Sequence, residues 1–280
     1  MVTSGICKLT NANGNFVKSH IIPRAYTNLN LDQNMRIELG QLGDRPRIRH
    51  DSWYDSKLVT LEGEKILADY DEAFALQAKK FGLCWRHHPI KNYASRSQTE
   101  SIFDTSLYTF DELDSHALRM FFLSLLWRSA NTTLPGFKEI RLDVVSHMKL
   151  KRIVSGAVLP HSTDFPITLV VHNTKGQPQN LSPIRDKLVV PQLANGLKSE
   201  LKIFRFFVDG LVAHIGRKSM DAKLRQCWRG RVLGVDNPTV VIGRPYEGSW
   251  QEQNIGFLQE ELHRDWPVQA EKIYGSLKNG

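Results

Sequence analysis

The sequence predicts an α+β fold, in which a compact N-terminal unit is followed by a larger mixed α/β part. Two observations predict this class. Apolar residues recur at helical spacing in the N-terminal third, whereas β-branched and aromatic runs separated by turn signals dominate the chain after Phe165. Hydrophobic residues make up 41% of the 280 residues, which is enough to build a sizeable core.

The N-terminal unit, residues 1–82, is predicted to contain a strand and a helix. Asn15–Ile22 alternates in polarity and carries β-branched residues, which is typical of a strand. Residues 64–81 carry apolar side chains at helical spacing, with acidic residues at the beginning and basic residues at the end. Gly82 then predicts the helix stop. A long polar stretch, Asn28–Ser52, separates the strand from the helix.

Residues 83–105 are polar and mixed in composition, and are predicted to form a connector. Residues 106–280 are predicted to form an α+β domain that binds the substrate or a partner. Helices are expected at Phe110–Ala130, after a cap at Thr109, at Asp143–Val154 and, as a short helix, at Asn254–His263. A strand is expected at Ile167–Val171. Lys202–Phe207 and Leu211–Ile215 are expected to form a hairpin around Asp209-Gly210.

Charge and cysteine content limit the partners and the compartment. The net charge of +8 and the pI of about 9.4 favour a polyanionic partner, although the same charge could serve solubility alone. Three widely spaced cysteines do not form a disulfide framework and favour a reducing cytoplasm. No apolar signal segment opens the chain, and the most apolar run, Met120–Trp127, is too short to cross a bilayer. A membrane partner is therefore not expected.

Three segments carry the most specific pattern: Cys7-Lys-Leu-Thr10, Phe16-Val-Lys-Ser-His-Ile-Ile-Pro23 and Asp55-Ser-Lys-Leu-Val-Thr-Leu-Glu-Gly-Glu-Lys-Ile66. Together they resemble the HNH nuclease family, whose pattern has a Cys pair, a strand ending in acid-His-Ile-x-Pro, and a second Cys pair followed by His. The Ser-His-Ile-Ile-Pro segment looks most like that of a group of bacterial HNH-like proteins. The resemblance implies a ββα-metal unit, in which a β-hairpin lies against one helix and holds a single catalytic metal ion.

The resemblance assigns roles to individual residues. His20 falls on the general-base histidine, and Asp55 on the middle asparagine that orients this base, although Asp55 could instead face the metal. Glu64 falls on the final histidine and is the candidate metal ligand, while Ser19 stands where the pattern has an acidic ligand. A neutral imidazole can take a proton from water near neutral pH. Oxygen ligands suit Mg²⁺ or Mn²⁺, of which one ion is expected.

Each of these residues also has a simpler structural interpretation. His20 could be a satisfied histidine at a strand end, Asp55 could cap a turn, and Glu64 could interact only with the helix dipole. His172-Asn173, which follows the predicted buried strand and could form a turn, is kept as a candidate for a second site.

The chain departs from the family pattern at the structural zinc. The family uses two Cys pairs, and zinc in such a site is held by thiolates. Here Cys7 is the one cysteine left, since Thr10, Thr60 and Gly63 occupy the other three positions. We therefore expect no structural zinc and predict that ordinary packing holds the hairpin.

Two basic segments are candidates for contact with nucleic acid. Arg45, Arg47 and Arg49 alternate, so that on an extended segment they would share one face. A second cluster surrounds an aromatic residue, Trp228, which could stack on a base; its basic members are Arg217, Lys218, Lys223, Arg225, Arg229 and Arg231. A solvated basic face is the alternative interpretation of this cluster.

The sequence leaves three functional hypotheses open. The first is a metal-dependent endonuclease acting on nucleic acid, with DNA favoured over RNA, in a defence or mobile-element setting that the resemblance implies. The second is a catalytically inactive HNH-like subunit that binds nucleic acid together with a protein partner or a second copy of the chain. In the third, the motif match is accidental and the chain is an α+β enzyme of another kind.

Overall fold

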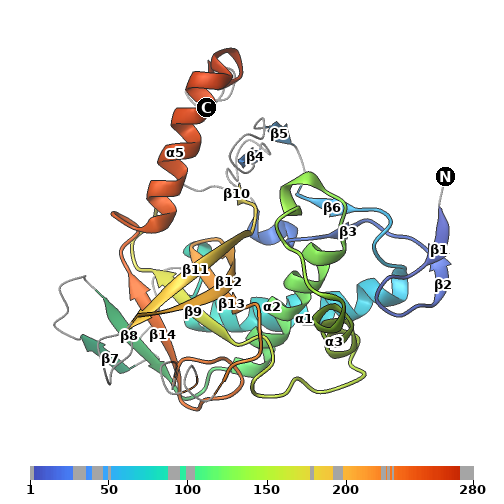
Figure 1. The fold of residues 1–280 in the computed structure, drawn as a ribbon, viewed down its shortest axis with the longest axis horizontal. Helices are drawn as coiled ribbons and strands as arrows, with labels where there is room; N and C mark the ends of the chain where they lie inside the picture. The colour runs from blue at the N-terminus through green and yellow to red at the C-terminus, as the bar shows by residue number, and fades with distance from the viewer. Residues whose placement is uncertain are drawn as a thin grey trace.

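The computed structural model describes residues 3–27, 36–39, 47–49, 52–87, 95–98, 105–176, 180–191, 198–221, 225, 228 and 230–271. The fold is mixed α+β, as predicted. Helices α1 (Leu61–Phe81), α2 (Ser115–Asn131) and α3 (Val144–Val154) lie between a large sheet and the short N-terminal strands, and α5 (Trp250–Asp265) extends away from the sheet (Figure 1). No helix in the described ranges combines the length and the apolar character needed to span a membrane.

The large sheet has seven strands, and its neighbours are antiparallel except for one parallel pair, β9 with β14. In spatial order the strands are β11 (Ile184–Pro191), β12 (Lys198–Val208), β13 (Leu211–Gly216), β9 (Ile167–His172), β14 (Thr239–Arg244), β8 (Ser106–Phe110) and β7 (Ser95–Gln98). The predicted hairpin is present as β12 and β13, and both turn residues, Asp209 and Gly210, have positive φ (47° and 83°). A two-residue turn with two positive φ angles matches the right-handed twist of its strands.

The two faces of this sheet have different neighbours because successive side chains alternate. Phe204 and Phe206 of β12 belong to the main hydrophobic core, together with Phe121 of α2. Arg205 and Phe207, which alternate with them, point to the outer face. There Phe207 joins a smaller cluster that includes Ile255 of α5, so α5 covers part of the outer face.

Helix α1 forms where the apolar spacing predicted it. It ends at Gly82, whose φ of 68° is left-handed and whose N–H donates to the carbonyl of Ala78. Phe74 of α1 stacks on Phe121 of α2, with ring centroids 3.7 Å apart. Helix α2 is apolar on nearly every side because α1, α3 and the sheet surround it.

The beginning of α2 differs from the prediction. Residues 106–110 form β8, which pairs with β14, and the helix begins after Asp114, whose carboxylate accepts from the N–H of Ala117. Thr109 is therefore a strand residue and not the helix cap. The apolar pattern continues from β8 into α2 because both elements bury apolar side chains, so it does not mark where the strand ends and the helix begins.

The N-terminal strands are shorter than the single strand predicted at Asn15–Ile22. They form three small sheets: β1 (Ser4–Ile6) with β2 (Asn13–Asn15), β3 (Ser19–His20) with β6 (Tyr54–Asp55), and β4 (Arg36–Leu39) between β5 (Arg47–Arg49) and β10 (Asn180–Leu181). Short 3₁₀ turns follow at Arg24–Tyr26, Trp85–His87 and Pro135–Phe137. Figure 1 shows β3 and β6 beside one another, near α1.

The parts predicted as separate domains share one hydrophobic core. A single cluster of buried residues contains Cys7 and Ile21 from the first region and Leu126 and Ile167 from the third. The expected connector also contributes, since Leu83 is buried and β7 joins the large sheet. Burying these residues together removes them from water, which holds the N-terminal strands against the rest of the chain.

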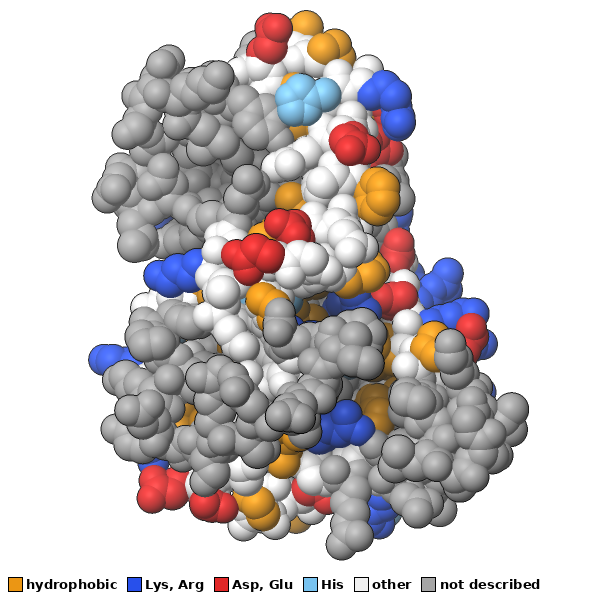
Figure 2. Space-filling model, turned by 90° about the vertical axis from the view of Figure 1, so that its left-hand side faces the viewer, with side chains coloured by type: hydrophobic (Ala, Val, Ile, Leu, Met, Phe, Trp, Pro, Cys, Tyr) orange, Lys and Arg blue, Asp and Glu red, His pale blue; other side chains and the backbone are white. Residues whose placement is uncertain are grey.

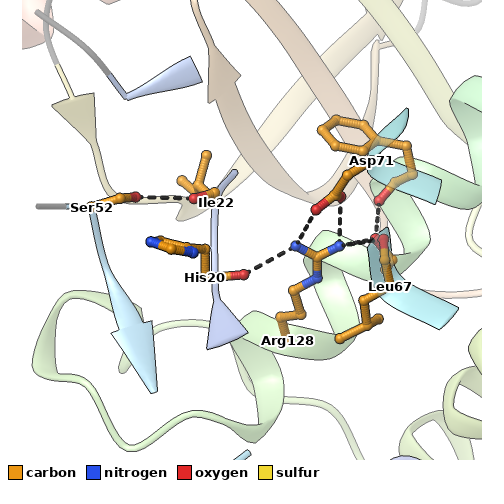
Figure 3. A network of polar contacts seen from close by, with 8 residues as sticks. His20, Ile22, Ser52, Leu67, Asp71 and Arg128 are labelled. Carbon is orange, nitrogen blue, oxygen red and sulfur yellow. Dashed lines mark hydrogen bonds and ion pairs between the residues drawn. The ribbon is translucent and has the colours of Figure 1, made fainter. Parts of the chain in front are cut away.

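A buried arginine links the helices to the N-terminal strands. Arg128 of α2 donates two hydrogen bonds to the carboxylate of Asp71 on α1 (2.6 and 3.1 Å), and further bonds to the carbonyl oxygens of Leu67 and His20 (3.3 and 3.0 Å). Figure 3 shows these bonds around one guanidinium. The Arg128 side chain is 2% exposed and that of Asp71 is 25% exposed. Burial raises the pKa of Asp71, while Arg128 and His20 act against this rise.

We expect Arg128→Met to lower the free energy of unfolding by about 3 kcal/mol, because it leaves Asp71 without its cation and the His20 carbonyl without a donor. Urea unfolding measures the change. The matched control is Lys80→Ala, which breaks an ion pair whose side chains are 45% and 75% exposed and should cost less than about 0.5 kcal/mol. Equal stability of the two variants would contradict the structural role of Arg128.

His214 on the outer face of β13 predicts a pH dependence of stability. Burial, followed by the charges of Arg205 and Arg244, lowers its pKa to about 3 from the ordinary 6.5. The unfolded chain therefore binds a proton below pH 6.5 that the folded chain does not bind. Stability should fall as pH drops through this window, by up to about 1.4 kcal/mol per pH unit. Urea unfolding at pH 7.5, 6.0 and 5.0 should show a shallower loss for His214→Gln than for the original chain.

Candidate active site

The candidate site begins with the ribbon formed by β3 and β6. Ser19 pairs with Asp55 and His20 pairs with Tyr54 in an antiparallel register. Ser19 and Asp55 are buried, whereas His20 is half-buried and Tyr54 is exposed. Because side chains alternate across a ribbon, Ser19 and Asp55 lie on its inner face and His20 and Tyr54 on its outer face.

This register changes the interpretation of Asp55. Its carboxylate accepts from the N–H of Lys57 (2.8 Å) and from the hydroxyl of Thr132 (2.9 Å). These bonds fix the turn after β6 and join it to the end of α2. The role of orienting His20 predicted for Asp55 does not fit, since the two side chains lie on opposite faces of the ribbon. The turn-capping alternative is the arrangement observed.

The outer face of the ribbon carries three side chains of different chemistry. The rings of His20 and Tyr54 lie edge to face, with centroids 6.4 Å apart. The ammonium of Lys18 lies 4.1 Å from the centre of the Tyr54 ring, within range of a cation–π interaction. An imidazole, a phenol and a cation are thus gathered on one partly exposed surface.

Helix α1 carries two carboxylates, of which Asp71 is linked to this ribbon. Glu64 and Asp71 are seven residues apart, so they lie on the same side of α1. Asp71 is tied through Arg128 to the His20 carbonyl, and the His20 imidazole is close enough to influence the pKa of Asp71. One oxygen of Glu64 is buried and has no hydrogen-bond donor among the described residues. The buried hydroxyl of Ser19 is in the same condition.

Asp71 and Arg128 were not singled out as site residues from the sequence. The available signals were an acid seven positions after Glu64, and an arginine at the end of the most apolar run of the chain. A charge inside an apolar helix needs a partner. The sequence does not say which acid supplies that partner, because the two residues come from different helices.

The oxygens around α1 agree in part with a site for a Mg²⁺-class ion. Within the described ranges, no three His, Cys, Asp or Glu side chains form a group that could hold a metal ion. Mg²⁺, however, commonly uses one or two carboxylates and takes its other ligands from water and substrate phosphates. The unpartnered buried oxygen of Glu64 has the chemistry of such a ligand. Ser19 offers only a neutral hydroxyl from the inner face.

The four positions that the resemblance aligns with zinc cysteines converge in space. The thiol of Cys7 accepts from the N–H of Thr10 (3.5 Å) and from the backbone of Thr60. A Cβ added at Gly63 would lie 2.7 Å from the Cys7 sulfur. Burial raises the pKa of the Cys7 thiol, but hydrogen bonds from Thr10, Thr60 and Leu9 outweigh burial, so the pKa lies below its ordinary value. Residues distant in sequence thus meet around one buried sulfur.

The residues predicted to contact nucleic acid differ in their exposure to solvent. Trp228 is 3% exposed and packs in a small cluster with Met220 and Val232, so it has no free face for a base. Its predicted stacking role was therefore wrong: its apolar neighbours bury the ring. Lys218 and Arg225 are exposed and Arg217 is half-buried. Arg45 and Arg229 lie outside the described residues.

For Arg47 and Arg49, two of the three alternating arginines, the structure describes the backbone. Arg47 and Arg49 lie in β5, an extended strand paired with β4, as the alternation predicts. Among the described side chains on the face shown in Figure 2, acidic and basic residues are interspersed.

No protein-family model, no curated protein and no solved structure matches the chain.

The contact between Gly63 and Cys7 can be tested by a double-mutant cycle. Gly63→Ala should lower the free energy of unfolding by about 1–2 kcal/mol, because the new methyl group overlaps the Cys7 sulfur. In the background of Cys7→Ala, the same change should cost at least about 1 kcal/mol less, since the sulfur is gone. Equal costs in both backgrounds, measured by urea unfolding, would show that the two residues are not in contact.

Proposed function

We propose that the chain is a metal-dependent nuclease that hydrolyses phosphodiester bonds, with His20 as the general base and Glu64 as a ligand of one Mg²⁺ or Mn²⁺ ion. One observation carries the proposal. Cys7, Thr10, Thr60 and Gly63 gather around one sulfur although three of them cannot bind zinc. This agrees with the alignment to the HNH pattern, which is the same alignment that assigns His20 and Glu64.

The surroundings of His20 suit proton transfer from water. His20 is half-buried beside Tyr54, and its Nε2 atom is buried, so a phosphodiester would have to approach the ring from the outer face of the ribbon. Its backbone is fixed by Arg128, which holds the strand against α1. A bound ion would supply the electrophile that neutralises the phosphate. Lys18 adds a nearby cation that could contact the nucleic-acid backbone.

The substrate class follows from the resemblance and the net charge. A formal charge of +8 favours a polyanion. DNA is favoured over RNA by the resemblance to the HNH family, which also suggests a role in defence or in a mobile element. Arg47, Arg49, Arg217, Lys218 and Arg225 are the charged candidates for phosphate contact.

A second candidate function is an inactive HNH-like subunit that binds nucleic acid. It is favoured by the neutral Ser19 and by the lack of three converging metal-ligand side chains within the described ranges. The two functions differ in catalysis and share nucleic-acid binding, so one experiment separates them.

The experiment is plasmid nicking with Mg²⁺ or Mn²⁺, beside the variants His20→Ala and Glu64→Gln. We expect both variants to lose at least about 100-fold in rate, because one lacks the base and the other a ligand. His20→Ala keeps the bond to Arg128, since the acceptor is the backbone carbonyl. Glu62→Gln, an exposed change in the same helical turn, is the control and should retain the original rate.

The outcomes distinguish the candidates. Equal nicking by His20→Ala and the original chain would remove His20 from the mechanism. Binding of DNA or RNA without cleavage, with either ion, would favour the inactive subunit. Restoration of cleavage when Mn²⁺ replaces Mg²⁺ in Glu64→Gln alone would support its role as a ligand, since Mn²⁺ tolerates weaker oxygen donors.

A further inference from the structure

A cavity of about 260 Å³ opens on the outer face of the large sheet, where α5 begins. Its volume is slightly below the usual range for pockets that hold drug-sized ligands, so it suits a small molecule. Its floor is formed by β9, β12, β13 and β14, and its wall by the turn before α5 and the first residues of that helix. The polar groups that line it include Arg205, His214, Arg244, His172, Ser249 and Gln251, as well as the carboxylate of Glu247, which accepts a hydrogen bond from the hydroxyl of Thr174.

Two arginines give the cavity positive charge. Arg205 is buried, pairs with Asp186 (2.8 Å) and lies over the Trp250 ring (4.1 Å). Its buried Nε–H has no acceptor among the described residues. The side chain of Arg244 has no hydrogen bond or ion pair with the described part of the chain, and it lies at the end of β14 beside the cavity.

His214 is a second polar group at the cavity. It pairs with Arg205 across β12 and β13, so the two side chains stand next to each other on the outer face. It is 9% exposed, and its ring makes no hydrogen bond to the described residues. The pKa of His214, lowered by burial and then by Arg205 and Arg244, keeps the ring neutral. An unpaired buried polar group is costly unless a ligand or water satisfies it.

The beginning of α5 adds donors to the same cavity. Ser249 caps the helix by accepting from the N–H of Glu252, and the Glu252 carboxylate accepts from the N–H of Gly248. The N–H groups of Trp250 and Gln251 belong to the first turn, which has no acceptors within the helix. The positive end of the helix dipole lies at the cavity that Arg205 and Arg244 also line.

We propose that this cavity binds the phosphate group of a small organic phosphate monoester. Arg244 and the Nε–H of Arg205 supply charge-assisted donors, and His214 supplies a neutral donor beside them. Val170, Phe207 and Val212 on the floor strands form apolar walls around the bound molecule's organic part. The site is separate from the His20 ribbon in sequence and in chemistry, and it does not depend on the proposed nuclease activity.

Ligand titrations by calorimetry and thermal unfolding test the proposal, with adenosine 5′-monophosphate, ribose 5-phosphate, inorganic phosphate and adenosine as probes. We expect both organic phosphates to bind and to raise the unfolding temperature, and adenosine to do neither. Inorganic phosphate should bind at least about 10-fold more weakly, because it lacks contacts with the apolar walls. Equal affinity for inorganic and organic phosphate would overturn the organic part of the proposal, and no binding by any phosphate would overturn it entirely.

Variants separate the cavity from the rest of the molecule. Arg244→Gln and His214→Gln should each weaken binding of adenosine 5′-monophosphate about 10-fold or more. Arg264→Gln, at the opposite end of α5 where the side chain is exposed and pairs with Asp265, should bind as the original chain does, and so should His20→Ala. Unchanged affinity in both cavity variants would overturn the assignment. Loss of nicking in His20→Ala with retained phosphate binding would show that the two proposals stand independently.

Discussion

The guanidinium of Arg128 is the constraint on which the N-terminal part of the structure depends. It lies inside the protein and reaches Asp71 and the Leu67 carbonyl on α1, as well as the His20 carbonyl on β3. A buried cation must be paired, and removing either partner is far more costly than leaving the pair intact. The packing of α2 against α1 therefore fixes the strand that carries His20. A two-residue strand would have little stability without this support.

Packing and hydrogen bonds join the chain segments around Cys7. Around Cys7, the small residues Thr10, Thr60 and Gly63 let the chain segments approach closely, and hydrogen bonds satisfy the sulfur. The thiol is fully buried within the same core as α1 and α2. These N-terminal segments therefore share one core with the rest of the chain, and burial in that core holds them together.

The large sheet serves two purposes because its faces alternate. Its inner face contributes phenylalanines to the core, and its outer face presents arginine and histidine to a cavity at the beginning of α5. The same strands carry both sets of residues, such as Phe204 and Arg205 on β12. The rigidity that the core gives to these strands also fixes the polar groups of the cavity, which reduces the entropy lost when a ligand binds.

Local sequence determined those elements whose signals are local. The helical spacing before Gly82, the helical pattern of Asp143–Val154 and the Asp209-Gly210 turn each predicted the element observed. The sequence alone also aligned Cys7 with Thr60 and Gly63. Tertiary structure decided the rest. It placed Asp55 on the opposite face of the ribbon from His20, buried Trp228 in a small apolar cluster, and put strand β8 before α2. It also paired Asp71 with Arg128 and left the Nε–H of Arg205 without an acceptor among the described residues. The physical reason is that burial and pairing are set by contacts between distant segments, and the periodicity of one segment carries no record of which other segment will cover it.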